Sequence, residues 1–488
     1  MATPIPSNRA RFSLSDVVSA VRGTSSHRGG RDEEIAESIV SDSRRVVPGG
    51  IFVALRGESL DGHAYAESAA ARGARILIVG RASKLSIQKE NCSVVEVDDT
   101  LVAWGDLARL HLERWRASVG GDAAKIVAIT GSAGKTTTKE LTAALLSEVA
   151  PTHFTAGNLN NRIGVPAVVF ALEASSRFCV LEMGMSLPGE LDAITAFARP
   201  DVSVVVNVGV AHAEGVGGRE GVMREKGAVY RALGPDGIAI VNLDDPWVVR
   251  AAEGTRAARR FTFGSGASSE ATHYRVVERA PERIGSRVRL ACGSREISVH
   301  LPIPGEAAAI DLAAALAAQE AASGVRLPED VIERALSRAG VTLSGRGNVR
   351  ELRDGTLLLD DTYNANPASM RAALRTLAEI APGRRRIAIL GEMKELGPLA
   401  EEEHAALGDA IAEAKVAVAI GCGGLMSRAL ERAAALGTEV IASETTDEAE
   451  ASALARVKPG DAVLVKGSRS VGTEKIAAAL VRRAEEVR

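Results

Sequence analysis

Several residue types and patterns are scarce or missing in this 488-residue chain, and each shortage narrows its class. Aromatic residues make up only 3% of the sequence, so alanine, valine and leucine must build the hydrophobic cores. The net charge of −3 argues against a nucleic-acid partner held by bulk charge. The four cysteines show no metal-ligand spacing, and Cys179 and Cys422 stand in apolar stretches typical of reduced core thiols.

Membrane and export segments are missing from the sequence as well. No apolar run approaches the length of a membrane span. The first residues lack the charged and then apolar pattern of a signal segment. We therefore expect a cytoplasmic protein without membrane insertion or a nucleic-acid partner, and we expect a monomer.

Residues 125–146 join an apolar strand to a glycine turn and a helix. Residues 125–129 are typical of a buried strand, and Leu141, Ala144 and Leu145 then recur at helical spacing. Such a junction presents free backbone N–H groups at the positive end of the helix dipole. The pattern predicts a nucleotide phosphate loop, which contains Gly131, Ser132, Ala133, Gly134, Lys135, Thr136 and Thr137.

Each part of this loop has its own expected task. The two glycines would let the backbone close around phosphate oxygens, Lys135 would reach the terminal phosphates, and the Thr136 hydroxyl would bind Mg²⁺. The common spacing has a glycine where this chain has Ile129, and the alternative is a glycine-rich turn with a surface lysine. A phosphate loop alone does not distinguish an ATPase, a GTPase, a kinase or a ligase.

Further predicted strands of the central region also end in polar groups. Residues 178–181 lead to Glu182, residues 204–206 lead to Asn207 and His212, and residues 238–241 lead to Asn242. In an open parallel sheet, ligands bind beyond the carboxyl ends of the strands, so these groups should share one crevice. Thr136 and Glu182 are the natural oxygen pair for Mg²⁺. The alternatives are a surface carboxylate at Glu182 and a packed or solvent-facing histidine at His212.

The order of strand-like and helix-like patterns predicts an α/β protein of three domains, in keeping with a length too great for one core. Residues 1–112 are expected to form a small α/β domain, from which a helix over 100–118 leads into the next domain. Residues 113–340 form a central, mostly parallel sheet with a β-rich insertion over 255–300 and helices over 306–340. Residues 341–488 form a Rossmann-like domain with strands at 357–359, 387–390, 416–420 and 463–465.

Longer motifs resemble those of one known family. They are Asp42-Ser-Arg-Arg, Asp61-Gly-His, Gly157-Asn-Leu-Asn-Asn, Leu181-Glu-Met-Gly-Met, Asp360-Asp-Thr-Tyr-Asn-Ala-Asn-Pro, Leu390-Gly-Glu-Met-Lys-Glu-Leu-Gly and Leu464-Val-Lys-Gly-Ser-Arg-Ser. Together they resemble the Mur ligases of peptidoglycan synthesis over nearly the whole chain. The family's short Gly-x-x-Gly-Lys-Thr loop also accounts for the unusual spacing before Gly134.

The resemblance implies an ATP-dependent amide ligase that uses ATP and Mg²⁺. The implied substrates are UDP-N-acetylmuramoyl-tripeptide, which supplies the carboxylate, and D-alanyl-D-alanine, which supplies the amine. The third peptide residue stays open between lysine and diaminopimelate. The implied substrate-binding residues are Ser43, Arg44, Gly57, Asp61, His63, Asn158, Asn160 and Asn161.

The resemblance also implies roles near the nucleotide. Besides the phosphate loop, the nucleotide contacts would be Asn242, Asp361 and Asn364. A carbamylated Lys226 would help to hold a second Mg²⁺ with His212, whereas position alone favours a helix-surface lysine. The implied catalytic residues are Lys135, Glu182, His212, Lys226 and Arg346, with Thr136, Glu182, His212 and Lys226 as metal ligands.

The chain departs from the family pattern after Gly305. Ala307 and Ala308 stand where a His-Asn pair is expected, and Asp311 replaces a further asparagine. In relatives these side chains lie near the adenine. Two alternative functions remain. One is a related folate polyglutamate ligase, which would lack the motifs at 157 and 360, and the other is a nucleotide-binding switch that hydrolyses ATP slowly.

Overall fold

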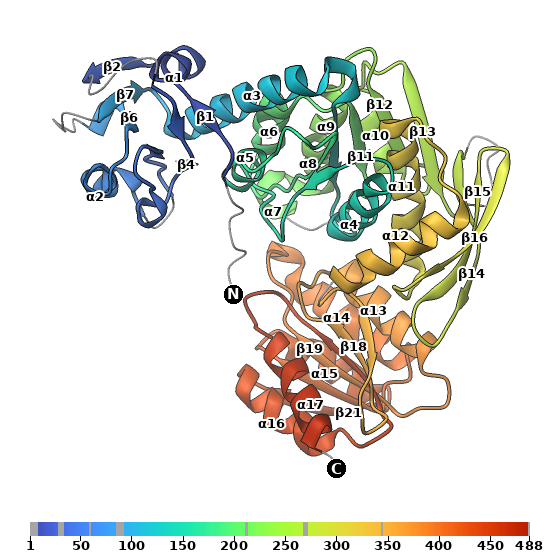
Figure 1. Cartoon of the computed structure of the whole chain (residues 1–488). Helices are drawn as coiled ribbons and strands as arrows, with labels where there is room; N and C mark the ends of the chain where they lie inside the picture. The colour runs from blue at the N-terminus through green and yellow to red at the C-terminus, as the bar shows by residue number, and fades with distance from the viewer. Residues whose placement is uncertain are drawn as a thin grey trace.

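The computed structural model describes residues 8–27, 34–57, 60–83, 92–209, 213–266, 272–342 and 345–486. Three sheets follow one another along this part of the chain, with five, nine and six strands, beside a two-stranded ribbon. Figure 1 shows the first sheet beside the central one and the third below it. The predicted three-part α/β fold is confirmed, while the exact domain ranges stay predictions.

The first sheet is parallel except at one edge. Its strand order is β2-β7-β6-β5-β4, with β2 antiparallel to β7. Helix α2 follows a 3-10 turn over residues 62–65, which Asp61 caps. The elements of this region are β1 (Arg11–Phe12), α1 (Leu14–Val21), β2 (Thr24–His27), β3 (Ala36–Glu37), β4 (Ile39–Val40), β5 (Ile51–Val53), α2 (Ala66–Ala71), β6 (Ile76–Gly80) and β7 (Ser93–Val97).

One long helix, α3 (Thr100–Val119), links the first sheet to the central one (Figure 1). Asp99 caps its start by accepting from the N–H groups of Leu101 and Val102. The indole N–H groups of Trp104 and Trp115 donate to carbonyl oxygens of the central region, at 3.0 and 2.8 Å. The predicted helix over 100–118 is confirmed, and it crosses the expected boundary at residue 112.

The central sheet has the order β16-β15-β14-β13-β12-β11-β8-β10-β9. It is parallel from β9 to β14, and the last two strands are antiparallel. The strands are β8 (Lys125–Thr130), β9 (Thr152–Phe154), β10 (Phe178–Glu182), β11 (Val202–Val205), β12 (Ile238–Asn242), β13 (Arg259–Gly264), β14 (Tyr274–Pro281), β15 (Ser286–Cys292) and β16 (Arg295–Leu301). The β-rich character predicted over 255–300 is confirmed, but the prediction of a separate insertion is wrong, because these strands extend the same sheet.

Helices cover both faces of the central sheet. Alternate residues of β8 pack to opposite sides: Ile126 lies in the core with α3, and Val127 lies in the core with α4 and α11. The alanine-rich α11 lies close beside α4, since small side chains permit a short approach. The helices are α4 (Lys135–Ser147), α5 (Gly164–Val169), α6 (Glu190–Ala198), α7 (Ala213–Val216), α8 (Gly218–Lys226), α9 (Ala228–Arg231), α10 (Pro246–Ala252), α11 (Glu306–Ser323) and α12 (Glu329–Thr342).

The third sheet has the order β17-β18-β22-β19-β20-β21 and is parallel except for β17. Its strands are β17 (Asn348–Glu351), β18 (Leu357–Asp361), β19 (Arg386–Gly391), β20 (Val418–Cys422), β21 (Glu439–Ser443) and β22 (Ala462–Lys466). Its helices are α13 (Pro367–Ile380), α14 (Ala400–Glu413), α15 (Met426–Ala435), α16 (Thr446–Arg456) and α17 (Glu474–Glu486). The Rossmann-like prediction is confirmed.

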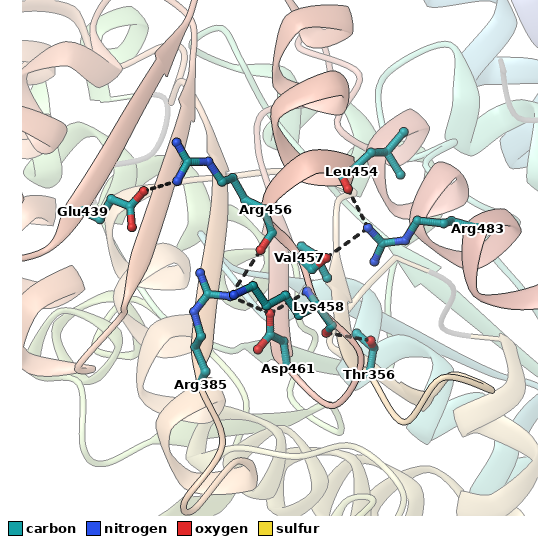
Figure 2. A network of polar contacts seen from close by, with 9 residues as sticks. All are labelled: Thr356, Arg385, Glu439, Leu454, Arg456, Val457, Lys458, Asp461 and Arg483. Carbon is teal, nitrogen blue, oxygen red and sulfur yellow. Dashed lines mark hydrogen bonds and ion pairs between the residues drawn. The ribbon is translucent and has the colours of Figure 1, made fainter. Parts of the chain in front are cut away.

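A polar network fastens the amino-terminal edge of this third sheet (Figure 2). Arg385 donates to Asp461 and to the Arg456 carbonyl, at 3.1 and 3.2 Å. Asp461 also accepts from the Lys458 N–H at 2.8 Å. The arginines at 384–386 therefore bond within the third domain. In the described ranges, no helix has the length and apolarity needed to cross a membrane.

Candidate active site

The phosphate loop lies where β8 runs into α4. Gly134 precedes the first helical residue with φ 78°, a left-handed conformation that favours glycine. No side chain caps α4, so the N–H groups of its first turn remain available to an anion. Lys135 Nζ donates to the Gly131 carbonyl at 2.7 Å, which folds the lysine back over the loop.

Asn207 holds the other side of the loop. Its side-chain oxygen accepts from the N–H groups of Ser132 and Ala133, at 3.1 and 2.9 Å, and its amide donates to the Ala133 carbonyl at 3.1 Å. The Ser132 hydroxyl accepts from the Gly209 N–H at 2.8 Å. In the sequence, Asn207 is marked only by its position at the end of a strand. That position is the signal that could have predicted its contact with the phosphate loop.

The expected oxygen pair is formed. Thr136 Oγ1 donates to Glu182 Oε2 at 2.6 Å, and Asn160 Nδ2 donates to Glu182 Oε1 at 2.7 Å. Glu182 is 2% exposed and Thr136 is 6% exposed, so the alternative of a surface carboxylate is wrong. The Glu182 N–H donates to the Thr155 hydroxyl at 2.9 Å, which fixes the end of β10.

A buried lysine stabilises the Thr136–Glu182 pair through Thr155. Lys139, one turn after Lys135 on α4, is fully buried and donates to the Thr155 carbonyl at 2.7 Å. Thr155 thereby connects α4 to the main chain of Glu182. Sequence reasoning missed both residues, because nothing in their local pattern shows which strand end they meet.

This donor set fits Mg²⁺. A hydroxyl and a carboxylate are hard oxygen ligands, and Mg²⁺ completes its coordination with water and substrate phosphates instead of a full protein cage. Within the described ranges, no cluster of three or more His, Cys, Asp or Glu side chains could hold a metal. Thr136 and Glu182 would therefore hold Mg²⁺ together with phosphate oxygens.

Lys226 is 1% exposed at the end of α8, so the helix-surface reading of this lysine is wrong. Burial and then the nearby Lys135 charge push its pKa well below the ordinary value, and Glu225 opposes this. No hydrogen bond or ion pair joins its amine to another residue in the part of the chain that the structure describes. His212, its expected partner, lies outside the described residues.

The third domain presents its own charges to the phosphate loop. Lys466 donates to Asp361 at 2.6 Å and to the Asn364 carbonyl at 2.8 Å. Arg346 stacks on Tyr363, with 3.5 Å between the guanidinium carbon and the ring centre. Burial raises the pKa of Asp361, while Lys466 and Arg346 oppose that rise.

Charges from the two domains act on each other across this junction. Burial lowers the pKa of Lys135, Glu182 raises it again, and Arg346 lowers it further. Glu182 likewise contributes to the raised pKa of Tyr363, for which burial is the largest cause. The structure therefore brings Lys135, Thr136 and Glu182 together with Arg346 and Asp361.

Two of the residues predicted to bind ligands form hydrogen bonds to the neighbouring main chain. Asn242 donates to the Val206 carbonyl at 2.8 Å and accepts from the Asp244 N–H at 2.9 Å. Asn161 accepts from the N–H groups at the start of α5, at 3.1 and 2.7 Å. The roles of Asn242, Asn158 and Asn161 toward ligands stay predictions.

The residues expected to hold the uridine diphosphate end belong to the first domain, whose sheet and helix α2 lie apart from α4 (Figure 1). Asp61 accepts from His63 Nδ1 at 2.5 Å, and His63 Nε2 accepts from the Gly80 N–H at 2.9 Å. Arg44 pairs with Asp42 at 2.7 Å, beside the buried Ser43, and the Gly57 N–H donates to the Leu60 carbonyl. Their substrate-binding roles stay predictions.

Three family models match the chain in order. They are described as "Mur ligase family, catalytic domain" over residues 36–111, "Mur ligase middle domain" over 129–319 and "Mur ligase, glutamate ligase domain" over 345–469. The middle-domain match covers the phosphate loop and Glu182, and the last match covers Arg346 and Asp361.

Individual proteins are similar to this chain over most of their length. The UDP-N-acetylmuramoyl-tripeptide–D-alanyl-D-alanine ligase of Escherichia coli (strain K12) is 36% identical, over 91% of this chain and 93% of that protein. A crystal structure of MurF from Acinetobacter baumannii has a TM-score of 0.85 at 31% identity, covering 98% and 100%. MurF ligase from Thermotoga maritima, solved in complex with ADP, has a TM-score of 0.79 at 27% identity, covering 92% and 98%.

The Thr136–Glu182 pair predicts that Mg²⁺ tightens nucleotide binding through one carboxylate. Replacing Glu182 by Gln keeps the size of the side chain and removes its charge. The factor by which Mg²⁺ lowers the dissociation constant of ADP should therefore fall about tenfold or more, or roughly 1.4 kcal/mol. Calorimetric titration of ADP with and without Mg²⁺ measures this effect. The exposed Glu253→Gln serves as control, and an unchanged Mg²⁺ effect in Glu182→Gln would contradict the assignment.

Proposed function

Because this chain belongs to the Mur ligase family, we propose that it is an ATP-dependent ligase that joins D-alanyl-D-alanine to UDP-N-acetylmuramoyl-tripeptide in peptidoglycan precursor synthesis. The observation that carries the proposal is the buried Thr136–Glu182 pair beside Lys135, faced by Arg346 of the third domain. The names of the similar proteins supply the substrates.

The reaction needs an activated carboxyl group. A carboxylate is a poor acceptor for an amine, because an oxide-like oxygen leaves badly. Transfer of the ATP γ-phosphoryl group to a carboxylate oxygen forms an acyl phosphate and ADP. The dipeptide amine then attacks the carbonyl carbon, a tetrahedral intermediate forms, the C–O bond to phosphate breaks, and the amine gives up a proton as the amide forms.

The chain's own residues lower the cost of bringing two anions together. Lys135 and the first-turn N–H groups of α4 bind phosphate oxygens, and Arg346 places a second cation on the opposite wall. Mg²⁺ held by Thr136 and Glu182 would neutralise charge that develops on the phosphoryl oxygens. Removing one such preorganised group costs on the order of 3 kcal/mol, roughly a hundredfold in rate.

The first and third domains supply the two other substrate sites in this proposal. The uridine diphosphate end would lie near Ser43, Arg44, Gly57, Asp61 and His63, and the dipeptide would enter from the side of Asp361 and Asn364. We expect the reaction to take place in the cytoplasm, where ATP is available, with the enzyme as a monomer.

Lys226 would act as a carbamate. Its buried amine forms no ion pair with a described residue, Glu225 offsets only part of the lowering of its pKa, and it lies close enough to Lys135 for their charges to repel. Addition of CO₂ would convert this amine into an anion that can hold a second Mg²⁺ and pair with Lys135.

Phosphate release tests the ligase assignment against the two alternatives. We expect inorganic phosphate only when the nucleotide-linked tripeptide and D-alanyl-D-alanine are both present, because the acyl phosphate needs the first and its breakdown to product needs the second. The tripeptide should be supplied in lysine and diaminopimelate forms. ATP hydrolysis that ignores both substrates indicates a switch, and phosphate release with a folate and glutamate indicates the folate enzyme.

Carbamylation predicts dependence on CO₂. Activity should fall when bicarbonate is depleted and return when it is restored, and native mass spectrometry should show one added CO₂ on the protein. Lys226→Arg keeps the positive charge and blocks carbamate formation, so its rate should fall about a hundredfold. The added mass should disappear in Lys226→Arg and persist in the exposed Lys458→Arg. Full activity without bicarbonate and without added mass would refute the carbamate.

A further inference from the structure

Asp311 is a buried acid beside the phosphate loop that the proposed reaction does not use. It lies on α11, is 5% exposed, and packs so closely on Gly134 that a Cβ there would collide with its carboxyl group. A carboxylate in such a place is unexpected, because the same loop must accept the phosphates of ATP. An ionised Asp311 would therefore repel the phosphates at this point.

The surroundings of Asp311 offer little to stabilise a charge. Among the described residues no ion pair includes Asp311, and the one side-chain donor that acts on its carboxyl is the Thr138 hydroxyl. The Thr138 hydroxyl lies near enough to lower the carboxyl's pKa in part. That hydroxyl is fully buried and has no hydrogen bond of standard geometry within the described chain. Burial dominates and raises the pKa of Asp311 to about 8.

Within the described residues, the charged groups on the elements packed against α11 form no ion pair with Asp311. On α4, Lys135 bonds to Gly131 and Lys139 bonds to Glu140 and Thr155. Strands β11 and β12 carry no charged residue. The remaining charged groups are Lys125 at the start of β8, Arg259 and Arg260 at the start of β13, Arg275, Glu278 and Arg279 on β14, and Arg371, Arg375 and Glu379 on α13.

We propose that Asp311 is a positioning residue that supports the phosphate loop as a neutral acid, and that its ionisation at alkaline pH weakens the binding of ATP. In the neutral form its O–H group can serve as a donor at Gly134 and Thr138, much as a carboxamide would. In the ionised form it places a negative charge next to the nucleotide phosphates, in a site too buried for water to screen the repulsion. This inference rests on the proposed use of ATP.

The sign of the effect follows from linkage. ATP binds the protonated form better, so binding must take up a proton once the pH exceeds the carboxyl's pKa, and affinity then falls as pH rises. Below that pKa the affinity should not depend on Asp311. Deprotonation of Lys135 also weakens binding at high pH, but it acts equally on a variant that differs only at residue 311.

The test is the dissociation constant of MgATP, measured calorimetrically at pH 7 and pH 9 for the full-length protein without the other two substrates. Asp311→Asn keeps the shape and cannot ionise. The ratio of wild-type to Asp311→Asn dissociation constants should be near one at pH 7 and about tenfold at pH 9, since a pKa near 8 leaves about a tenth of the acid neutral. Asp330→Asn, an exposed change on α12, should follow wild type at both pH values.

An equal ratio at both pH values would overturn the inference while leaving the ligase assignment intact. If the wild-type protein binds no MgATP at pH 7, the proposed function itself fails. Thermal unfolding of the variant at both pH values establishes that it is folded. Asp311→Ser, which also lacks a charge, should then give the same ratios to wild type as Asp311→Asn, and ratios that do not change between pH 7 and pH 9 for both variants would contradict a role for this carboxyl.

Discussion

The hydrogen bond between Thr136 and Glu182 joins the ends of two neighbouring parallel strands, and the rest of the site is arranged around it. In the register of β8 and β10, Glu182 pairs with Ile129, just before the phosphate loop begins. The carboxylate therefore lies beside the loop by virtue of strand pairing alone. Asn160 and Thr155 then fix its side chain and its main chain, so the pair is rigid before any nucleotide arrives.

Positive charge gathers around this pair from three parts of the chain. Lys135 comes from the loop, Lys226 from α8 and Arg346 from the third domain. Arg346 adds to the lowering of the Lys135 pKa, and Lys135 adds to the lowering of the Lys226 pKa. Glu182 opposes the shift at Lys135. Basic side chains held this close repel one another in the absence of ligands, and phosphate and carboxylate groups relieve the repulsion when they bind. This arrangement suits a reaction that must bring two anions together.

Local patterns were enough to predict much of this arrangement. The phosphate loop, the strand that precedes it and the carboxylate at the end of the next strand follow from apolar runs, glycines and the rule for parallel sheets. The burial of Lys226 could not be predicted in this way, because it depends on how α8 packs against α6 and α10. The roles of Asn207 and Thr155 were missed for the same reason: their partners lie far away in sequence.

The error over residues 255–300 has a similar cause. Their strands alternate with exposed charges, as at an edge, and only the pairing of β13 with β12 shows that they extend the central sheet. The substitution of Asp311 for an amide is visible in the sequence, but its burial against Gly134 is not. Residues that act through distant neighbours therefore required the structure.

The central claim is that this site transfers a phosphoryl group to the substrate carboxylate, and oxygen labelling tests it most directly. The nucleotide-linked tripeptide would carry ¹⁸O in its terminal carboxylate, and the phosphate released during ligation would be analysed by mass spectrometry. The account predicts one ¹⁸O atom in each phosphate ion, because the C–O bond breaks after that oxygen has joined phosphorus. Phosphate without label, formed at the same rate as the amide, would contradict it.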